Sequence, residues 1–258
     1  MQFYNEVLGE SYDDNNKPME LEDILNACSK VRGMVPDPYR FKAKATEEHF
    51  AGLDWATQTD PRRANKKTNS YTILTIGRYN YIKHRMEVVY VKRYFDHTDN
   101  KFNDPDWVVA DIVELMERFN VITLGCDWGG GHKENQRIKE ALQRDYEPGR
   151  VIEFMHTTQT SFAVYDDIND LVKLSRSLAI TDFIDHLKGI GLGAPFFEFP
   201  VFEGQTSEYS DDLLSVYKFN DRHGKVLYDH TSPDDWMHSL IYLLMVFKND
   251  RGTLEYAA

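Results

Sequence analysis

Apolar and polar positions divide the chain into a strand-rich part and a part in which strands and helices alternate. Three apolar stretches rich in β-branched and aromatic residues predict strands, of which the first ends at Asp54, the second runs from Ser70 to Arg78 and the third from Met86 to Tyr94. Polar or turn-forming residues separate these stretches, so we expect the strands to form an antiparallel meander.

The period of the pattern changes after residue 104. Helical spacing covers residues 105–118, 132–144 and 168–187, and strand patterns lie between these helices at 121–126 and 151–155. Strands that alternate with helices run parallel and are joined by right-handed crossovers. Together with the meander, this predicts an α/β fold: a mixed sheet, antiparallel in its first three strands and parallel afterwards, flanked by helices.

The two ends of the chain carry weaker patterns. Residues 1–45 hold loop-forming residues and at most one short helix, so we interpret them as an N-terminal arm or connector and residues 46–258 as one domain. Residues 189–212 are rich in Gly, Pro and acidic residues and predict a loop with at most a short edge strand at Phe196 to Phe199. A last helix is expected from Pro233 to Lys248, with Ser232 as its N-cap.

Single acids stand where these predicted elements begin or end. Asp54 closes the first strand, Asp127 follows the strand over 121–126, and Asp234 and Asp235 stand at the start of the last helix. An acid at the end of an apolar strand costs free energy unless a charged group meets it, and clustered carboxylates repel one another unless cations compensate them. We therefore predict that these acids meet around divalent cations, which prefer hard oxygen ligands.

The predicted ligand set suits two Mg²⁺ or Mn²⁺ ions. At about 4 Å from each other, two such ions can position a water and stabilise the leaving oxygen in phosphodiester cleavage. Asp54 is expected to bridge the ions, with Asp127 on one ion and Asp235 on the other. Asp234 could be a ligand or a supporting group. Each acid also has a structural alternative, because strand-end acids cap turns and first-turn acids favour the helix dipole.

Further charged residues near these acids could assist them. Asp60 is close enough to Asp54 in sequence to help bind metal. His238 lies about one helical turn after the acidic pair and could orient a carboxylate, contact the scissile phosphate, shuttle a proton or serve packing alone. Seven basic residues that follow Asp54 could contact DNA phosphates or form a solvated face: Arg62, Arg63, Lys66, Lys67, Arg78, Lys83 and Arg85.

Charge and composition restrict the class of protein. The formal net charge of −12 argues against a protein that holds nucleic acid by its overall charge, although it allows a local basic path. The two cysteines, Cys28 and Cys126, are far apart in sequence, so a disulfide framework is not expected and a reducing cytoplasm fits. No apolar run is long enough to span a membrane.

Three motifs, in this order and on these elements, resemble a known family: Gly52-Leu53-Asp54-Trp55-Ala56, Gly125-Cys126-Asp127-Trp128-Gly129-Gly130 and Pro233-Asp234-Asp235-Trp236-Met237-His238-Ser239-Leu240. The order of meander, strand–helix units and acids is similar to the ribonuclease H-like nuclease superfamily. Within it, the chain resembles the C-terminal nuclease domain of the large terminase subunit of tailed bacteriophages. The opening Asn5-Glu6-Val7-Leu8-Gly9 resembles the connector that follows that family's ATPase domain.

The resemblance implies an activity and partners. It implies a metal-dependent DNA endonuclease that cuts concatemeric viral DNA during genome packaging in the host cytoplasm. The implied partners are double-stranded DNA, a packaging ATPase domain, a small terminase subunit and a portal. No phosphate-binding loop of the form G-x-x-x-x-G-K-S/T occurs in this sequence, so we expect the nuclease part alone.

Two alternatives stay open at this point. The first is another nuclease of the same fold, such as a junction resolvase or an RNA–DNA hybrid nuclease. Cleavage of plain duplex, four-way junction and hybrid would separate these enzymes. The second is a non-catalytic module that uses the fold for docking in an assembly, which metal-dependent nicking of a plasmid would exclude.

Overall fold

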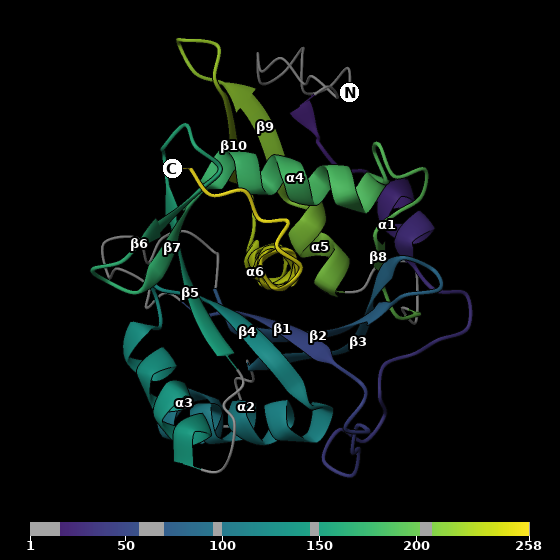
Figure 1. The fold of residues 1–258 in the computed structure, drawn as a ribbon. Helices are drawn as coiled ribbons and strands as arrows, with labels where there is room; N and C mark the ends of the chain where they lie inside the picture. The colour runs from purple at the N-terminus through teal and green to yellow at the C-terminus, as the bar shows by residue number, and fades with distance from the viewer. Residues whose placement is uncertain (1–15, 57–69, 95–99, 145–149, 202–207, 258) are drawn as a thin grey trace.

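The meander and the alternating part of the chain join in one sheet. The computed structural model describes residues 16–56, 70–94, 100–144, 150–201 and 208–257. Eight strands of this part form a mixed sheet in the order β6-β7-β5-β4-β1-β2-β3-β8, and two more form a separate hairpin (Figure 1). The strands are β1 (His49–Asp54), β2 (Thr72–Asn80), β3 (Arg85–Tyr94), β4 (Val121–Asp127), β5 (Arg150–Thr157), β6 (Ala163–Asp166), β7 (Leu171–Ser175), β8 (Phe197–Glu198), β9 (Val216–Asn220) and β10 (Val226–His230).

The directions of the strands confirm the expected mixed sheet. β1 pairs antiparallel with β2, and β2 pairs antiparallel with β3, which is the meander. On its other side β1 pairs parallel with β4, and β5 and β7 continue in the same direction. At one edge β6 is antiparallel to β7 and was not predicted. At the other edge the short β8 is parallel to β3, which confirms a short edge strand within Phe196–Phe199. The fold is ribonuclease H-like.

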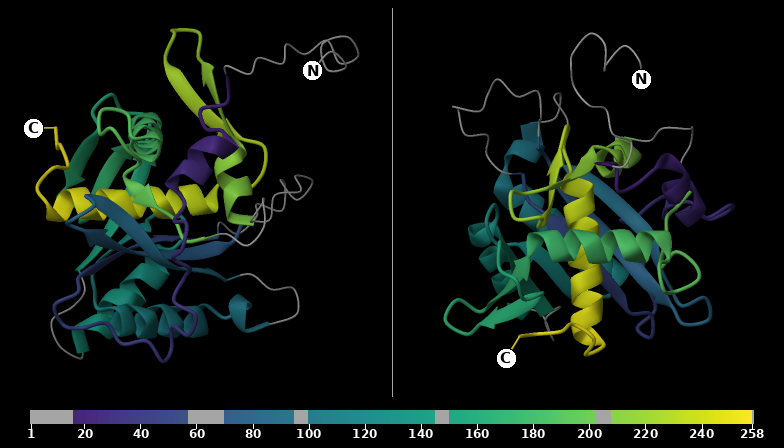
Figure 2. Two further views of the ribbon diagram at one scale, coloured as in Figure 1. Left: turned by 90° about the vertical axis from the view of Figure 1, so that its right-hand side faces the viewer. Right: turned by 90° about the horizontal axis from the view of Figure 1, so that it is seen from above.

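Helices cover both faces of this sheet. α2 and α3 lie on one face, and α6 lies on the other with α4 crossing over it; the hairpin β9–β10 projects from the α4 side (Figures 1 and 2). The helices are α1 (Leu21–Ala27), the 3₁₀ helix η4 (Asn100–Asn103), α2 (Pro105–Phe119), α3 (His132–Arg144), α4 (Arg176–Lys188), α5 (Glu208–Leu214) and α6 (Asp235–Asp250). No helix in the described part of the chain is both long and apolar enough to cross a membrane.

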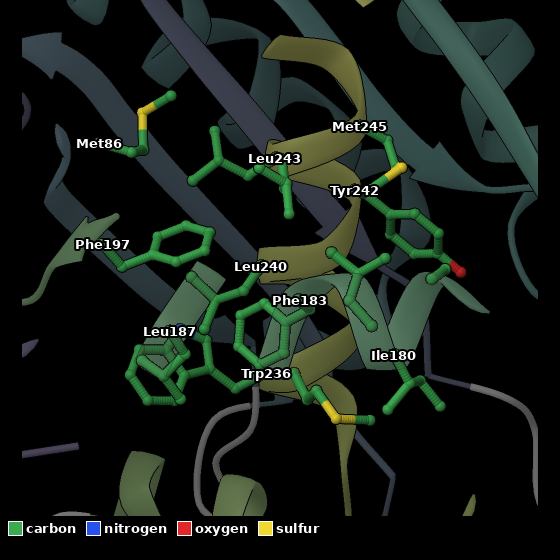
Figure 3. Packing of buried hydrophobic residues seen from close by; sticks show 14 of the residues in the cluster. Met86, Ile180, Phe183, Leu187, Phe197, Trp236, Leu240, Tyr242, Leu243 and Met245 are labelled. Carbon is green, nitrogen blue, oxygen red and sulfur yellow. The ribbon is translucent and has the colours of Figure 1, made fainter. Parts of the chain in front are cut away.

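α6 is enclosed on all sides, as a helix that is apolar around its whole circumference must be. Every residue from Asp235 to Phe247 is buried, and Leu240 packs in the same cluster as Phe197 (Figure 3). Gly52 allows the helix to approach β1 closely, because a Cβ at that position would lie 1.8 Å from the carbonyl oxygen of Ser239. The Ser239 hydroxyl in turn donates to the carbonyl of Gly52 at 2.8 Å. These contacts place the first turn of α6 beside the end of β1.

Two helix starts differ from the sequence prediction. The helix expected over 168–187 begins only at Arg176, because Leu171–Ser175 forms strand β7 between β5 and β6. Periodicity cannot distinguish a short apolar strand from the first turn of a helix, so the prediction joined the two. The last helix has Asp234 rather than Ser232 as its N-cap residue.

The described part of the arm packs onto the domain. Met19, Ile24 and Ala27 are each 1% exposed and belong to the core. The N–H of Phe199 donates to the carbonyl of Ala27 at 2.8 Å, which attaches the arm to the chain just after β8. The boundary between an arm and a domain at residue 45 stays a prediction.

Candidate active site

Three of the candidate acids converge at one end of the sheet. Asp54 and Asp127 end the neighbouring strands β1 and β4, which run parallel, so both lie at the same edge. Asp235 begins α6, which packs across β1. Burial, followed by the charges of Asp235 and Asp127, raises the pKa of Asp54 well above its usual range. The three acids are therefore close enough to interact electrostatically.

Asp235 is held from β2 and, indirectly, from α5. Its carboxylate accepts the Ser70 hydroxyl at 2.9 Å and the Tyr71 N–H at 3.0 Å. Burial raises the pKa of Asp235 even though these two donors favour its ionised form. Tyr71 also donates its hydroxyl to Asp212, and Asp212 accepts the N–H of Trp236 at 3.0 Å. Asp212 thus ties the first turn of α6 to the start of β2.

Asp127 and Asp54 differ in their hydrogen bonds. Asp127 accepts the N–H of Gly130 at 2.5 Å and the Tyr242 hydroxyl at 3.3 Å. The carboxylate of Asp54 receives no hydrogen bond from the described residues, although Asp54 is only 8% exposed. A buried carboxylate without a donor is costly when it is ionised. Asp54 is therefore the acid that most needs a cation.

Asp234 faces a different set of partners from its neighbour Asp235. One carboxylate oxygen of Asp234 accepts from Nε2 of His238 at 3.1 Å and from the Arg176 guanidinium at 3.3 Å. Burial opposes ionisation of Asp234, but the interactions with His238, His230 and Arg176 outweigh it and hold its pKa well below the usual range. Among the charges that raise the pKa of Asp54, Asp235 has the larger effect of the pair. Asp234 is thus a counter-ion on the α4 side of the acids.

Several side chains that support the acids were not among the sequence candidates, including Ser70, Asp212, Tyr242, Arg176 and His156. Asp212 lies in a stretch expected to be a loop, which instead forms α5. His156, at the end of β5, places its Nε2 3.2 Å from Nδ1 of His238. Only Tyr242 had a usable signal, because it follows His238 by four residues on an apolar helix and shares its face.

The basic candidates are not gathered at the acids in the described structure. Asp60, Arg62, Arg63, Lys66 and Lys67 lie outside the described residues. Arg78 pairs with His49 at the start of β1, whereas Asp54 at the end of β1 pairs with Ile73. Five residues of strand separate Arg78 from Ile73, which is about 16 Å at about 3.3 Å per residue. Nearness in sequence to Asp54 therefore does not become nearness in space for Arg78, or for the β2–β3 turn beyond it.

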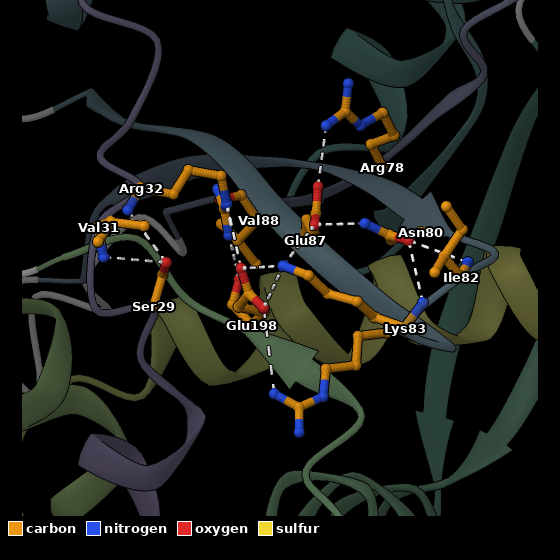
Figure 4. A network of polar contacts seen from close by, with 11 residues as sticks. Ser29, Val31, Arg32, Arg78, Asn80, Ile82, Lys83, Glu87, Val88 and Glu198 are labelled. Atoms are coloured by element: carbon orange, nitrogen blue, oxygen red, sulfur yellow. Dashed lines mark hydrogen bonds and ion pairs between the residues drawn. The ribbon is translucent and has the colours of Figure 1, made fainter.

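The basic residues around that turn are engaged by two buried acids at the β3–β8 edge. Arg78 pairs with Glu87 at 2.9 Å, and Lys83 pairs with Glu198 at 3.0 Å (Figure 4). Arg85 lies 4.0 Å from Glu198. These contacts join the edge strand to the meander, and a DNA-binding role for Arg78, Lys83 and Arg85 stays a prediction.

The acids are near one another but do not form a finished metal site. In the described residues, no three His, Cys, Asp or Glu side chains are arranged to hold a metal ion. Asp127 and Asp235 each accept hydrogen bonds from other described residues. A pocket of about 550 Å³ opens beside the ends of β1 and β4, with Trp55, Gly129 and Gly130 in its lining. Asp54 and Asp127 are not among the described residues that line this pocket.

Comparisons with known proteins concern the whole chain. No protein-family model and no curated protein matches it. Solved structures do: the large terminase nuclease domain of Thermus phage P74-26 has a TM-score of 0.52 at 12% identity, over 92% of this chain and 98% of that chain. The large terminase nuclease of thermophilic phage G20c with bound magnesium has a TM-score of 0.52 at 12% identity, over 90% of this chain and 97% of that chain. A mutant gp2c of the large terminase subunit of bacteriophage Sf6, with calcium, has a TM-score of 0.53 at 11% identity, over 87% of this chain and 97% of that chain.

The chain has the fold of a large terminase nuclease domain. The similarity extends over nearly all of both chains. At 12% identity the similarity establishes the terminase nuclease fold and leaves the chemistry to be argued from the residues of this chain.

Proposed function

We propose that this chain is a metal-dependent DNA endonuclease that cuts concatemeric viral DNA during genome packaging. The observation that carries the proposal is the convergence of Asp54, Asp127 and Asp235 from three elements of a terminase nuclease fold. The large terminase nuclease of thermophilic phage G20c, which has the same fold, has been found with bound magnesium and with bound cobalt. Those metals support a divalent-cation site here.

The chemistry of the acids fits Mg²⁺ or Mn²⁺. All three side chains offer hard oxygen ligands, which these ions prefer. Asp54 is buried without a hydrogen-bond donor among the described residues, and Asp235 and Asp127 repel its charge. A cation held between them would relieve both the burial penalty and the repulsion.

The residues take separate roles in the proposed site. Asp54, Asp127 and Asp235 would hold two divalent ions, with Asp54 shared between them. Such ions activate a water for attack on a phosphodiester and stabilise the leaving oxygen. Asp234 would position His238 by accepting its Nε2–H, and would not bind metal, because the carboxylate of Asp234 already accepts hydrogen bonds from His238 and Arg176.

The proposed partners follow from the same role. The substrate would be double-stranded DNA in the host cytoplasm, and a packaging ATPase domain, a small terminase subunit and a portal would complete the assembly. A net charge of −12 favours a partner that holds the DNA. Asp60 and the basic residues Arg62, Arg63, Lys66 and Lys67 follow Asp54 directly in the chain, and we include them as an auxiliary acid and as contacts to DNA phosphates.

Plasmid nicking tests the proposal. Supercoiled plasmid should be cut with Mg²⁺ or Mn²⁺ and spared in chelator, whereas Ca²⁺ should bind without supporting efficient cleavage because its looser coordination positions water poorly. Asp54→Asn and Asp127→Asn should abolish cutting while the proteins still fold. Equal activity in excess chelator would refute the metal-dependent mechanism, and preferential cutting of four-way junctions or RNA–DNA hybrids would assign the site to another nuclease of this fold.

A further inference from the structure

The sheet does not itself hold Asp54 beside Asp127. The last backbone pair between β1 and β4 is Leu53 with Cys126, one residue before the acids on both strands. Asp54 pairs outward with Ile73 of β2, and Asp127 pairs outward with β5. Each acid is therefore fixed to its outer neighbour, while their mutual repulsion acts where the β1–β4 ladder has ended.

The side chain of Asn135 spans this gap. Its Oδ1 accepts the indole N–H of Trp55, the residue after Asp54, at 2.7 Å. Its Nδ2 donates to the backbone carbonyl of Asp127 at 2.8 Å. Asn135 is 0% exposed, so these bonds form away from water. One buried amide thus joins the end of β1 to the end of β4.

A buried acid fixes the orientation of this amide. Nδ2 of Asn135 also donates to Glu153 of β5 at 2.8 Å. Glu153 has a side chain that is 0% exposed and also contacts Lys139 of α3 at 3.0 Å. An indole can only donate, and an ionised carboxylate can only accept, so the amide oxygen must face Trp55 and the amide nitrogen must face Glu153. Rotating the amide by half a turn would break both contacts.

The start of α3 is shaped to bring Asn135 to this position. The N–H of Asn135 donates to the carbonyl of Gly131 at 2.8 Å, in the first turn of the helix. A Cβ on Gly131 would lie 1.9 Å from Cδ1 of Trp55, so only glycine lets the indole lie against the helix start. Gly131 therefore serves this close contact as well as the turn between β4 and α3.

We propose that Asn135 is a positioning residue for the divalent-metal site, a role that rests on the proposed function. Its amide holds the ends of β1 and β4 together, so that Asp54 and Asp127 stay within reach of the same cation before metal arrives. Supporting partners of this kind change metal affinity or activity by about 10–100-fold when they are removed.

Manganese affinity of the whole chain, measured by calorimetry, tests this role together with the half-maximal manganese concentration for plasmid nicking. Asn135→Leu removes both ends of the link at similar volume, and Trp55→Phe removes the bond to Oδ1 together with part of the packing against Gly131. Each should weaken manganese binding by about 10-fold or more, and the double variant should be no weaker than Asn135→Leu, because both changes break the same link. Lys139→Met is the matched control, because it removes the contact between Lys139 and Glu153 but none of the bonds from Asn135 to the strand ends.

Melting in chelator separates positioning from folding. Lys139→Met should lower the melting temperature and leave manganese affinity at the wild-type value. If Trp55→Phe and Asn135→Leu lose stability but bind manganese like wild type, Asn135 is structural and the inference is wrong. If wild type binds manganese but never cuts DNA, the proposed nuclease function fails while the affinities still test the link. If wild type binds no manganese, both the proposed metal-dependent function and the positioning role of Asn135 are wrong.

Discussion

Asparagine substitutions at the adjacent acids of α6 should shift the stability of the metal-free protein in opposite directions. Asp235 has a raised pKa, mainly because it is buried. Each unit by which a carboxylate pKa is raised costs about 1.4 kcal/mol of folding free energy once the group is ionised. Asp235→Asn removes that charge, keeps the volume and keeps an oxygen for the Tyr71 N–H. We expect an unchanged or higher melting temperature in chelator.

Asp234→Asn, in contrast, should destabilise the metal-free protein. Its carboxylate accepts from Nε2 of His238, whose side chain is 10% exposed, and from Arg176, whose side chain is 39% exposed. Solvent screens the Arg176 contact, so only the bond to His238 counts at full value. A hydrogen bond to a charged group contributes about 1.5–3 kcal/mol. With about 2–4 °C per kcal/mol for a chain of this size, Asp234→Asn should melt about 3–12 °C lower.

Calorimetric melts in chelator near neutral pH measure these shifts, and plasmid nicking against manganese concentration measures the activities. Asp235→Asn should not cut DNA at any manganese concentration. Asp234→Asn should keep partial activity and need about 10–100-fold more manganese, because it loses a support and not a ligand. The reasoning is refuted if both variants shift stability in the same direction. If Asp235→Asn cuts like wild type while Asp234→Asn is inactive, the roles within the pair are reversed.

Two further predictions concern pH and salt. Burial raises the pKa of Asp212 to about 7. The stability that this acid contributes is therefore present below about pH 4 and is lost as the pH rises through 7. Metal-free protein should melt at a lower temperature at about pH 8 than at about pH 5.5, and Asp212→Asn should reduce that difference in thermal melts. With a net charge of −12, the isolated chain should bind duplex DNA weakly, with affinity falling steeply between about 50 and 200 mM salt in fluorescence anisotropy. Tight, salt-insensitive binding would contradict the need for a partner that holds DNA.

Local pattern was sufficient for the elements that carry the acids. The apolar runs ending at Asp54 and Asp127 and the apolar helix after Asp235 each have one period over enough residues to define the element. Parallel strands place their carboxyl ends at one edge, so the meeting of Asp54 and Asp127 followed from topology alone. The run over 171–175 was too short to have a period, and only pairing with β5 and β6 made it a strand.

What the sequence could not decide depends on contacts between distant segments. Whether Asp234 or Asp235 faces Asp54 depends on where α6 begins and on Arg176 and Tyr71, which come from other elements. The sequence alone determined that three acids lie at the ends of apolar elements in an α/β chain, because the spacing of apolar residues along the chain predicts which elements are buried and where they end. Only the tertiary structure carried Arg78 to the far end of β1 and brought Asn135 between the two strand ends, because strand length and helix packing decide which distant side chains meet.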